Sequence, residues 1–228
     1  MSQFAAQPTP ALMPDELLYG VDGAIATVTL NAPQRMNTIS GPMLKQLTEA
    51  LVRASEDPAV RVVILTGTGR AFCAGLNLEA QSKGTDNLSV GSGATPTNID
   101  LRNTPPPVLH AMDKPVIAAL NGSAAGYGLD LALGADIRLM AQSAKLAASY
   151  AKRGVLPESG GTWYLPRMLG WAKAAELIFT GRTLSAAQSL EIGLVNKVEP
   201  TPRSWARPAI LPWKSPPMRR SPSRLPSA

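Results

Sequence analysis

Cysteine and histidine each occur once in the 228 residues, as Cys73 and His110. A single cysteine forms no intrachain disulfide, and one histidine beside it cannot build a Cys- or His-rich metal site. We therefore expect no metal ion. No histidine is paired with Cys73 in the sequence pattern, which favours a small buried residue over a nucleophile. His110 is expected to be structural or solvated.

Long apolar runs are missing as well, and none approaches the roughly 18 to 20 residues that cross a membrane. Residues 1–14 have neither a basic start nor an apolar core, which is not the pattern of a signal peptide. We expect a cytoplasmic protein that makes no membrane contact. The length suits one sizeable α/β domain, or at most two small ones.

Most of the chain also lacks an excess of one charge. The net charge is +6, from 22 Lys and Arg against 16 Asp and Glu. Six of the basic residues lie in 200–228, which has no acidic residue, so residues 1–199 hold 16 charges of each sign. A neutral body gives no basic face for a nucleic acid. The basic stretch itself is expected to be a solvated segment.

Composition divides the chain into three parts. Residues 1–18 indicate a loose arm, and residues 19–199 indicate one core domain. Eight of the 29 residues in 200–228 are proline, so we expect this stretch to be disordered or to be an out-of-frame translation of a GC-rich gene. Within the core, residues 79–103 are rich in Ser, Gly, Thr and Asn, which predicts a mobile surface segment.

Strand patterns alternate with helix patterns along the core. Ser40 is expected to cap a helix that ends near Asp57. The run 60–66 is apolar throughout, as in a strand buried on both faces of a parallel sheet. The alternation predicts an α/β fold with a largely parallel sheet. Further helices are expected at 105–112, 127–133, 159–168, 171–179 and 185–192, and further strands at 24–30, 115–120, 136–140 and 195–198.

Two glycine-rich turns, far apart in the sequence, each follow an apolar strand. They read Ala71-Phe72-Cys73-Ala74-Gly75-Leu76-Asn77-Leu78 and Asn121-Gly122-Ser123-Ala124-Ala125-Gly126-Tyr127-Gly128-Leu129-Asp130. A turn that opens a helix leaves backbone N–H groups unpaired, with the helix dipole behind them. Two such turns facing one another would form an oxyanion hole.

The two turns belong to an ordered set of short motifs that resembles the crotonase family, the enoyl-CoA hydratase/isomerase superfamily. Each motif alone is weak, but their order and spacing across roughly residues 20–199 are highly specific. The motifs are VRVVILTG (60–67), AFCAG (71–75), KPVIAALNG (114–122), ADIR (135–138), SGGT (159–162) and GLV (193–195).

This resemblance implies a ββα spiral core, an acyl-CoA thioester substrate and assembly into a trimer or a dimer of trimers. Coenzyme A is then part of the substrate, and no separate cofactor is expected. The family's oxyanion amides correspond to Leu76 and Tyr127, the second of which is normally glycine. Only the N–H is used, so tyrosine is acceptable there if its φ is negative. The substrate-binding residues implied are Arg35, Ala74, Gly75, Leu76, Asn77, Leu78, Gly126 and Tyr127.

The resemblance also shows where this chain departs from hydratases, which use two glutamates on one water. The first glutamate corresponds to Asp130, whose side chain is one methylene shorter, and a misplacement of that size can lower a rate about 100-fold. The second corresponds to Tyr150, a poor base at neutral pH because phenol has a pKa near 10. Tyr150 is expected to pack or to donate a hydrogen bond instead.

Glu158 is a third acid, at a position where several isomerases of the family carry a carboxylate. One carboxylate that removes a proton from one carbon and returns it to another suffices for a double-bond shift. We therefore expect an isomerase with Glu158 as the base, ahead of a hydratase. Asp130 is the other candidate base. Either acid could instead have only a structural role, Asp130 in the first turn of a helix and Glu158 as a loop acid or the N-cap partner of the next helix.

Other interpretations remain open at this point. The departures at 130 and 150, and a proline-rich stretch where the family has its last helices, also fit a non-catalytic acyl-CoA binder. A serine protease of the related ClpP-like fold would need a Ser–His pair, which the surroundings of His110 do not match. Arg35 either contacts CoA phosphates or is a solvated loop arginine.

Overall fold

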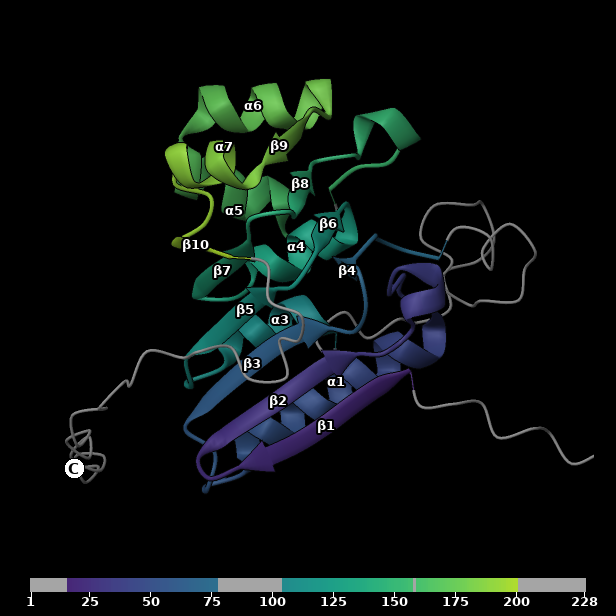
Figure 1. Ribbon diagram of the computed structural model, residues 1–228, viewed down its shortest axis with the longest axis vertical. Helices are drawn as coiled ribbons and strands as arrows, with labels where there is room; N and C mark the ends of the chain where they lie inside the picture. Colours follow the sequence, from purple (N-terminus) through teal and green to yellow (C-terminus); the bar gives the residue numbers. More distant parts are fainter. Residues whose placement is uncertain (1–15, 78–103, 158, 201–228) are drawn as a thin grey trace, which may run out of the picture.

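Two β-sheets and a set of short helices form the fold (Figure 1), and the computed structural model describes residues 16–77, 104–157 and 159–200. The larger sheet has six strands in the order β1-β2-β3-β5-β7-β10, and the smaller has four in the order β4-β6-β8-β9. In Figure 1 the helices α4 to α7 lie with the smaller sheet, whereas α1 lies against β1 and β2 of the larger one.

The larger sheet is parallel except for its first pair. β1 runs antiparallel to β2, and every later neighbour is parallel. Its central strands are almost fully buried, as expected for a parallel sheet covered on both faces. Its strands are β1 (Leu17–Asp22), β2 (Ile25–Leu30), β3 (Val62–Gly67), β5 (Val116–Leu120), β7 (Ile137–Ala141) and β10 (Lys197–Glu199).

The smaller sheet has strands of only three residues, and each of its first three strands follows a strand of the larger sheet along the chain. β4 and β6 are parallel neighbours, as are β6 and β8, and β9 closes the sheet antiparallel to β8. The strands are β4 (Ala71–Cys73), β6 (Ser123–Ala125), β8 (Lys145–Ala147) and β9 (Thr183–Ser185).

The helices agree closely with the sequence pattern. Ser40 caps α1, because its Oγ accepts a hydrogen bond from the Met43 amide 3.2 Å away. The buried face of α1 carries Leu47 and Leu51, whose burial contributes about 1.5–3 kcal/mol each. The helices are α1 (Gly41–Glu56), α3 (Pro105–Ala111), α4 (Tyr127–Leu133), α5 (Gly161–Leu169), α6 (Trp171–Thr180) and α7 (Ala186–Glu191), with short 3-10 helices η1 (Pro33–Arg35) and η3 (Ala151–Arg153).

The expected boundary of the N-terminal arm, 1–18, is wrong by a few residues. β1 begins at Leu17 and pairs with β2 from its first residue. Glu16, just before it, forms an ion pair with Arg35 at 2.7 Å. The alternation in these residues is broken by the exposed Leu18, so the strand is recognisable only through its partner.

Residues 1–15 and 201–228 lie outside the described part of the chain. The expectations of a loose arm and of a disordered or out-of-frame tail therefore stay predictions for these residues. The same holds for all of 79–103. Among the described helices, none is long and apolar enough to cross a membrane.

The pairing of β4 with β6 brings the two glycine-rich turns together. The turn at 74–77 follows β4, and the turn at Gly126 follows β6, so parallel pairing places both turns at the same edge of the smaller sheet. A Cβ built on Gly128 would lie 2.1 Å from the carbonyl oxygen of Cys73. The start of α4 therefore packs directly on the backbone of β4, and only glycine fits there.

We expect Gly128→Ala to destabilise the protein by about 1–3 kcal/mol, because the added methyl must push α4 away from β4. Gly20→Ala is the matched control, since a Cβ at Gly20 meets nothing within 4 Å. Urea unfolding of both variants measures the difference. Equal stability of the two variants would contradict the close packing described here.

Candidate active site

A cavity of about 630 Å³ opens beside the two turns. Its walls come from the loop that follows η1, the turn after β4, the start of α4 and the stretch 149–159. The cavity brings together most of the predicted site residues that lie in the described part of the chain. These are Arg35, Ala74, Gly75, Leu76, Asn77, Gly126, Tyr127, Asp130 and Tyr150.

The amides of Leu76 and Tyr127 stand on either side of the contact between the turns. A Cβ built on Gly75 would lie 3.1 Å from the Ala125 carbonyl oxygen and 3.9 Å from the Tyr127 nitrogen. Within the described residues, neither the Leu76 amide nor the Tyr127 amide donates a hydrogen bond to the protein. Two unpaired N–H groups at the wall of one cavity are the donors that an oxyanion hole requires.

Tyr127 is compatible with its place at the first residue of α4. Among the described non-glycine residues only Met36 and Asn37 have positive φ, so the φ of Tyr127 is negative and its amide is presented as in a normal helix start. The hydroxyl of Tyr127 is buried and finds no hydrogen-bond partner among the described residues. Burial raises the pKa of this phenol, and the nearby Cys73 and Asp130 raise it further, so Tyr127 is neutral.

Asp130 lies one turn further along α4 and is 2% exposed. Its carboxylate accepts hydrogen bonds from the Tyr150 hydroxyl and from the backbone amides of Ser159 and Gly161. Burial raises the pKa of the Asp130 carboxyl to about 7, and the three hydrogen bonds limit that rise. A carboxyl with a pKa near 7 can both take and return a proton at neutral pH.

Tyr150 packs against the core and uses its hydroxyl as a donor to Asp130. Burial raises the pKa of Tyr150, and the negative charge of Asp130 raises it further. A neutral phenol cannot act as a base here, which agrees with the expectation that Tyr150 donates a hydrogen bond.

The stretch before α5 supplies a feature that the sequence pattern did not indicate as functional. Gly161 opens α5, and a Cβ on it would lie 2.5 Å from Oδ1 of Asp130 and 2.8 Å from the Tyr150 hydroxyl. The glycine lets the helix N-terminus approach the carboxylate, where the dipole favours negative charge. In the sequence, SGGT at 159–162 indicates only the family, because a backbone amide that donates a hydrogen bond requires no particular side chain.

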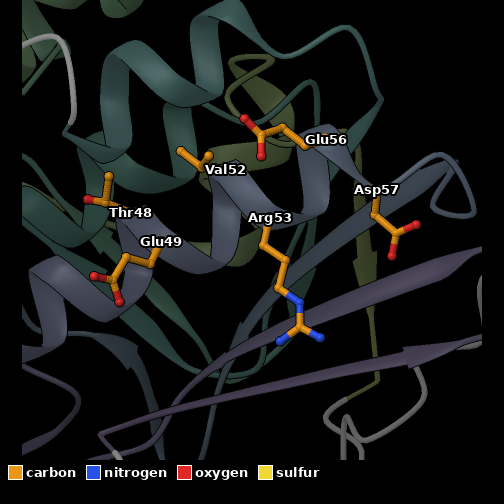
Figure 2. A pocket seen from close by; sticks show the side chains of 6 residues that line it. All are labelled: Thr48, Glu49, Val52, Arg53, Glu56 and Asp57. Atoms are coloured by element: carbon orange, nitrogen blue, oxygen red, sulfur yellow. The ribbon is translucent and has the colours of Figure 1, made fainter.

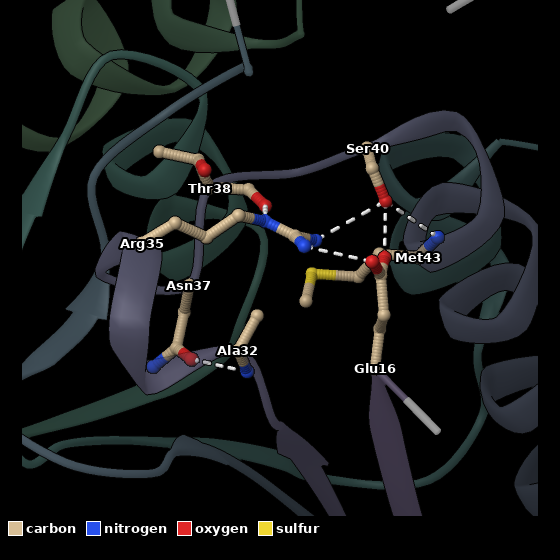
Figure 3. Close-up of polar contacts among 7 residues, drawn as sticks. All are labelled: Glu16, Ala32, Arg35, Asn37, Thr38, Ser40 and Met43. Atoms are coloured by element: carbon tan, nitrogen blue, oxygen red, sulfur yellow. Dashed lines mark hydrogen bonds and ion pairs between the residues drawn. The ribbon is translucent and has the colours of Figure 1, made fainter. Parts of the chain in front are cut away.

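Arg35 lines the cavity but is not a free cation (Figure 3). Its guanidinium donates to Glu16 at 2.7 Å, to the Ser40 hydroxyl at 3.2 Å and to the Thr38 carbonyl at 3.1 Å. The expectation of a solvated loop arginine is therefore wrong, because three acceptors already use the three guanidinium nitrogens. Contact with CoA phosphates stays a prediction.

Two predicted residues, Glu158 and Leu78, lie outside the described residues. Cys73 is fully buried, and burial raises its thiol pKa to about 12, so it is no nucleophile. His110 is exposed on the last turn of α3. Among the described residues, no group of three or more His, Cys, Asp or Glu side chains is arranged to hold a metal ion.

A second hollow, of about 660 Å³, follows one side of α1 and shares no residue with the cavity (Figure 2). Its residues are those of a solvent-facing helix, and none of them is buried. Arg53 lies over the ring of Tyr19, 4.7 Å from its centre. The hollow offers neither a buried acid nor a free backbone amide, so the candidate site is the first cavity. The six lining residues are Thr48, Glu49, Val52, Arg53, Glu56 and Asp57.

Known proteins are similar to this chain in both sequence and fold. Residues 20–210 match the family model described as enoyl-CoA hydratase/isomerase. The chain is 39% identical over 189 residues to the 1,2-epoxyphenylacetyl-CoA isomerase of Escherichia coli (strain K12). This alignment covers 82% of this chain and 70% of the relative.

Two solved structures show the same architecture. An enoyl-CoA hydratase from Bacillus anthracis has a TM-score of 0.70 at 33% identity, covering 82% of this chain and 70% of that one. A monofunctional enoyl-CoA isomerase from M. smegmatis has a TM-score of 0.66 at 35% identity, covering 82% and 78%. The crotonase fold expected from the ordered motifs is thus confirmed. Since the family model spans most of the chain and this similarity extends through its whole described core, the chain belongs to the enoyl-CoA hydratase/isomerase family.

Proposed function

We propose that this chain shifts the double bond of an enoyl-CoA thioester. The observation that carries the proposal is the partner of Asp130. Where a water-activating site would need a second carboxylate, the described structure has the neutral hydroxyl of Tyr150 bonded to Asp130. One carboxylate and an oxyanion hole are sufficient for isomerisation, whereas hydration must also hold and deprotonate a water.

The thioester oxygen of the substrate is placed between the amides of Leu76 and Tyr127. When a proton leaves the carbon next to the thioester, the negative charge of the resulting enolate moves to this oxygen. Fixed N–H donors at the wall of the cavity stabilise that charge by several kcal/mol. Neither amide must break a protein hydrogen bond first, because neither is used within the described residues.

The proton is carried by a carboxylate beside this cavity. Among the described residues Asp130 fits this role, because its pKa is raised to about 7 and it lines the cavity. It takes the proton from one carbon of the acyl chain and returns it to another, so the product has the composition of the substrate. Tyr150 and the amides at the start of α5 hold the carboxylate in place.

Hydration is the second candidate. The Bacillus anthracis structure with the same architecture is that of an enoyl-CoA hydratase, and Asp130 could hold a water at this wall of the cavity. Assembly into a trimer or hexamer is part of the same proposal and is tested by light scattering.

The oxyanion hole is tested by removing one amide hydrogen. Leu76→Pro deletes the N–H without losing a hydrogen bond to the described protein, so we expect kcat/KM to fall at least about 100-fold. Leu76→Ala keeps the amide and is the control. Tyr127→Gly should be tolerated, since the amide remains. Loss of all activity in a folded Tyr127→Gly variant would show that the side chain, and not only the backbone, is needed.

The raised pKa of Asp130 predicts two opposite pH dependences. The carboxylate is the active form, so kcat/KM should fall about tenfold per pH unit below about 7 and level off above it. Stability should run the other way. The folded pKa of about 7 exceeds the usual 3.8, so the folded state keeps a proton that the unfolded chain releases. The free energy of unfolding therefore decreases as pH rises from about 4 to about 7.

Asp130→Asn removes the titrating group and should abolish both effects. Rate profiles and urea unfolding across this pH range measure them on the same samples. An acidic limb near pH 7 that persists in Asp130→Asn would assign the limb to another group.

Substitution of the three candidate residues separates the possible bases. We expect Asp130→Asn to lower isomerisation of a 3-enoyl-CoA at least about 100-fold, the lower range for loss of a general base. Tyr150→Phe should cost less than about tenfold, the effect of one neutral hydrogen bond. The sequence alone favoured Glu158 as the base, and in that case Glu158→Gln would show the large loss and Asp130→Asn a smaller one.

The same variants distinguish isomerase from hydratase. The absorbance of the conjugated enoyl thioester increases when a 3-enoyl-CoA is isomerised and decreases when crotonyl-CoA is hydrated. Efficient hydration of crotonyl-CoA that depends on both Asp130 and Glu158 would establish the hydratase. No change with either substrate would leave an acyl-CoA binder.

A further inference from the structure

We propose that Asn37, which does not line the cavity, is a positioning residue for the Leu76 amide. It acts through residues 36–39, here called the strap. The proposal rests on the oxyanion role of Leu76 proposed above and adds the part of the chain that fixes the direction of its N–H group.

The strap holds the turn after β4 on both sides of Leu76. The Ala74 amide donates to the Met36 carbonyl at 3.0 Å, and the Ile39 amide donates to the Gly75 carbonyl at 2.8 Å. On the other side of Leu76, the Asn77 amide donates to the Ile39 carbonyl at 2.9 Å. The peptide group that carries the Leu76 N–H is therefore held through its Gly75 carbonyl, and the next peptide group through the Asn77 amide, while the Leu76 N–H itself is left for the cavity.

The strap keeps an unusual backbone conformation. Met36 and Asn37 have φ values of 57° and 55°, in the left-handed region that residues with side chains adopt rarely, although asparagine tolerates it better than methionine. Two consecutive residues of this kind reverse the chain between η1 and the bridge from Ile39 to Leu76. The position of the strap therefore depends on contacts that offset this strain.

Asn37 supplies these contacts from a fully buried position. Its Oδ1 accepts from the Ala32 amide at 2.8 Å, and its Nδ2 donates to the carbonyls of Thr68 and Ala71 at 2.9 and 2.8 Å. One amide side chain thus joins the strap to the end of β3 and to the start of β4, the strand that leads into the oxyanion turn. No apolar or charged side chain of this size offers one acceptor and two donor hydrogens.

A second group of contacts fixes the far end of the strap, and Figure 3 shows it beside Asn37. Arg35 donates to the Thr38 carbonyl within the strap and to Glu16 just before β1. Ser40 donates to the second oxygen of Glu16 and caps α1. The hydrogen bonds to Arg35 and Ser40, with the charge of Arg35, lower the pKa of Glu16 against the effect of burial, so it stays ionised at neutral pH. We call Glu16, Arg35 and Ser40 the clamp.

The strap is expected to affect catalysis through the position of the Leu76 amide. Met36 and Thr38 of the strap line the cavity on the same side as the turn after β4, whereas Asp130 is held by Tyr150 and the start of α5. Release of the strap would leave the carboxylate of Asp130 in place but would let the Leu76 amide turn or shift. A displacement of about 1 Å from the productive geometry can cost about 100-fold in rate. Because an oxyanion donor acts mainly on the transition state, the loss should fall on kcat more than on KM.

The test uses a chromophore that reports the oxyanion hole without turnover. Thioester-carbonyl polarisation moves the absorption of 4-dimethylaminocinnamoyl-CoA to longer wavelength, so the shift of the bound probe measures how well the amides engage it. We expect Asn37→Ala at saturating probe to lose about half or more of the wild-type shift, with kcat for a 3-enoyl-CoA lowered about 10- to 100-fold and KM changed by less than about threefold.

Asn121→Ala is the matched control for lost stability. Asn121 is also buried, accepts from the Gly67 amide, and donates to the carbonyls of Gly69 and Ala71, the second of which Asn37 also uses. Within the described residues it forms no hydrogen bond to the strap. It should lower the urea midpoint to a similar degree and keep the full spectral shift. A second test variant, Glu16→Gln, weakens the clamp at a site outside the cavity and should reduce the shift in the same direction if Asn37→Ala does not fold.

The outcomes separate this inference from the proposed function. Wild-type protein that binds the probe without a shift would refute the oxyanion hole itself. A wild-type shift that is retained in full by folded Asn37→Ala, or by Glu16→Gln when the first variant is unfolded, would overturn the positioning role. A shift lost equally in Asn121→Ala would also overturn it, because the effect would then follow stability alone.

Discussion

The parallel pairing of β4 with β6 is the contact on which the site depends. Each strand has only three residues, and each leads into a turn. In each turn one backbone amide, that of Leu76 or Tyr127, donates no hydrogen bond to the described protein. Because parallel neighbours end at the same edge, the pairing converts two unrelated turns into one pair of donors. Close packing of Gly128 on the Cys73 carbonyl fixes their separation, so the oxyanion hole proposed here would need little reorganisation.

The acid at this site shows a conflict between stability and chemistry. Burying Asp130 raises the free energy of its charged form, and the protein offsets part of that cost with a phenol and two backbone amides. A fully compensated carboxylate would keep a low pKa and would be a weak base. An uncompensated one would stay protonated. The partial compensation seen here leaves the pKa of the carboxyl at about 7. Removal of the buried charge is then expected to make the folded protein more stable.

The loop after η1 forms the other wall of the cavity, and residues behind that wall hold it in place. The strap is held by Asn37 and by the clamp, and these contacts connect β1, η1, β3 and the start of α1 to a single turn. Such a network explains why a strained backbone is tolerated in this loop, since several hydrogen bonds determine the same conformation. The same network gives Arg35 three acceptors within the protein. The sequence alone left open whether this side chain is solvated or contacts CoA phosphates.

The sequence by itself determined the family, the order of most strands and helices, and the two turns that carry the amides. These features depend on local information, such as apolar runs, the cap at Ser40 and glycines at fixed spacing. The short strands β4, β6, β8 and β9 could not be predicted, because three residues show no periodicity. Only the tertiary structure decided the environment of Asp130, the partner of Arg35 and the hydrogen bonds of Asn37. Burial, pKa and backbone amide donation arise from residues distant in sequence, and no local pattern encodes which of them meet.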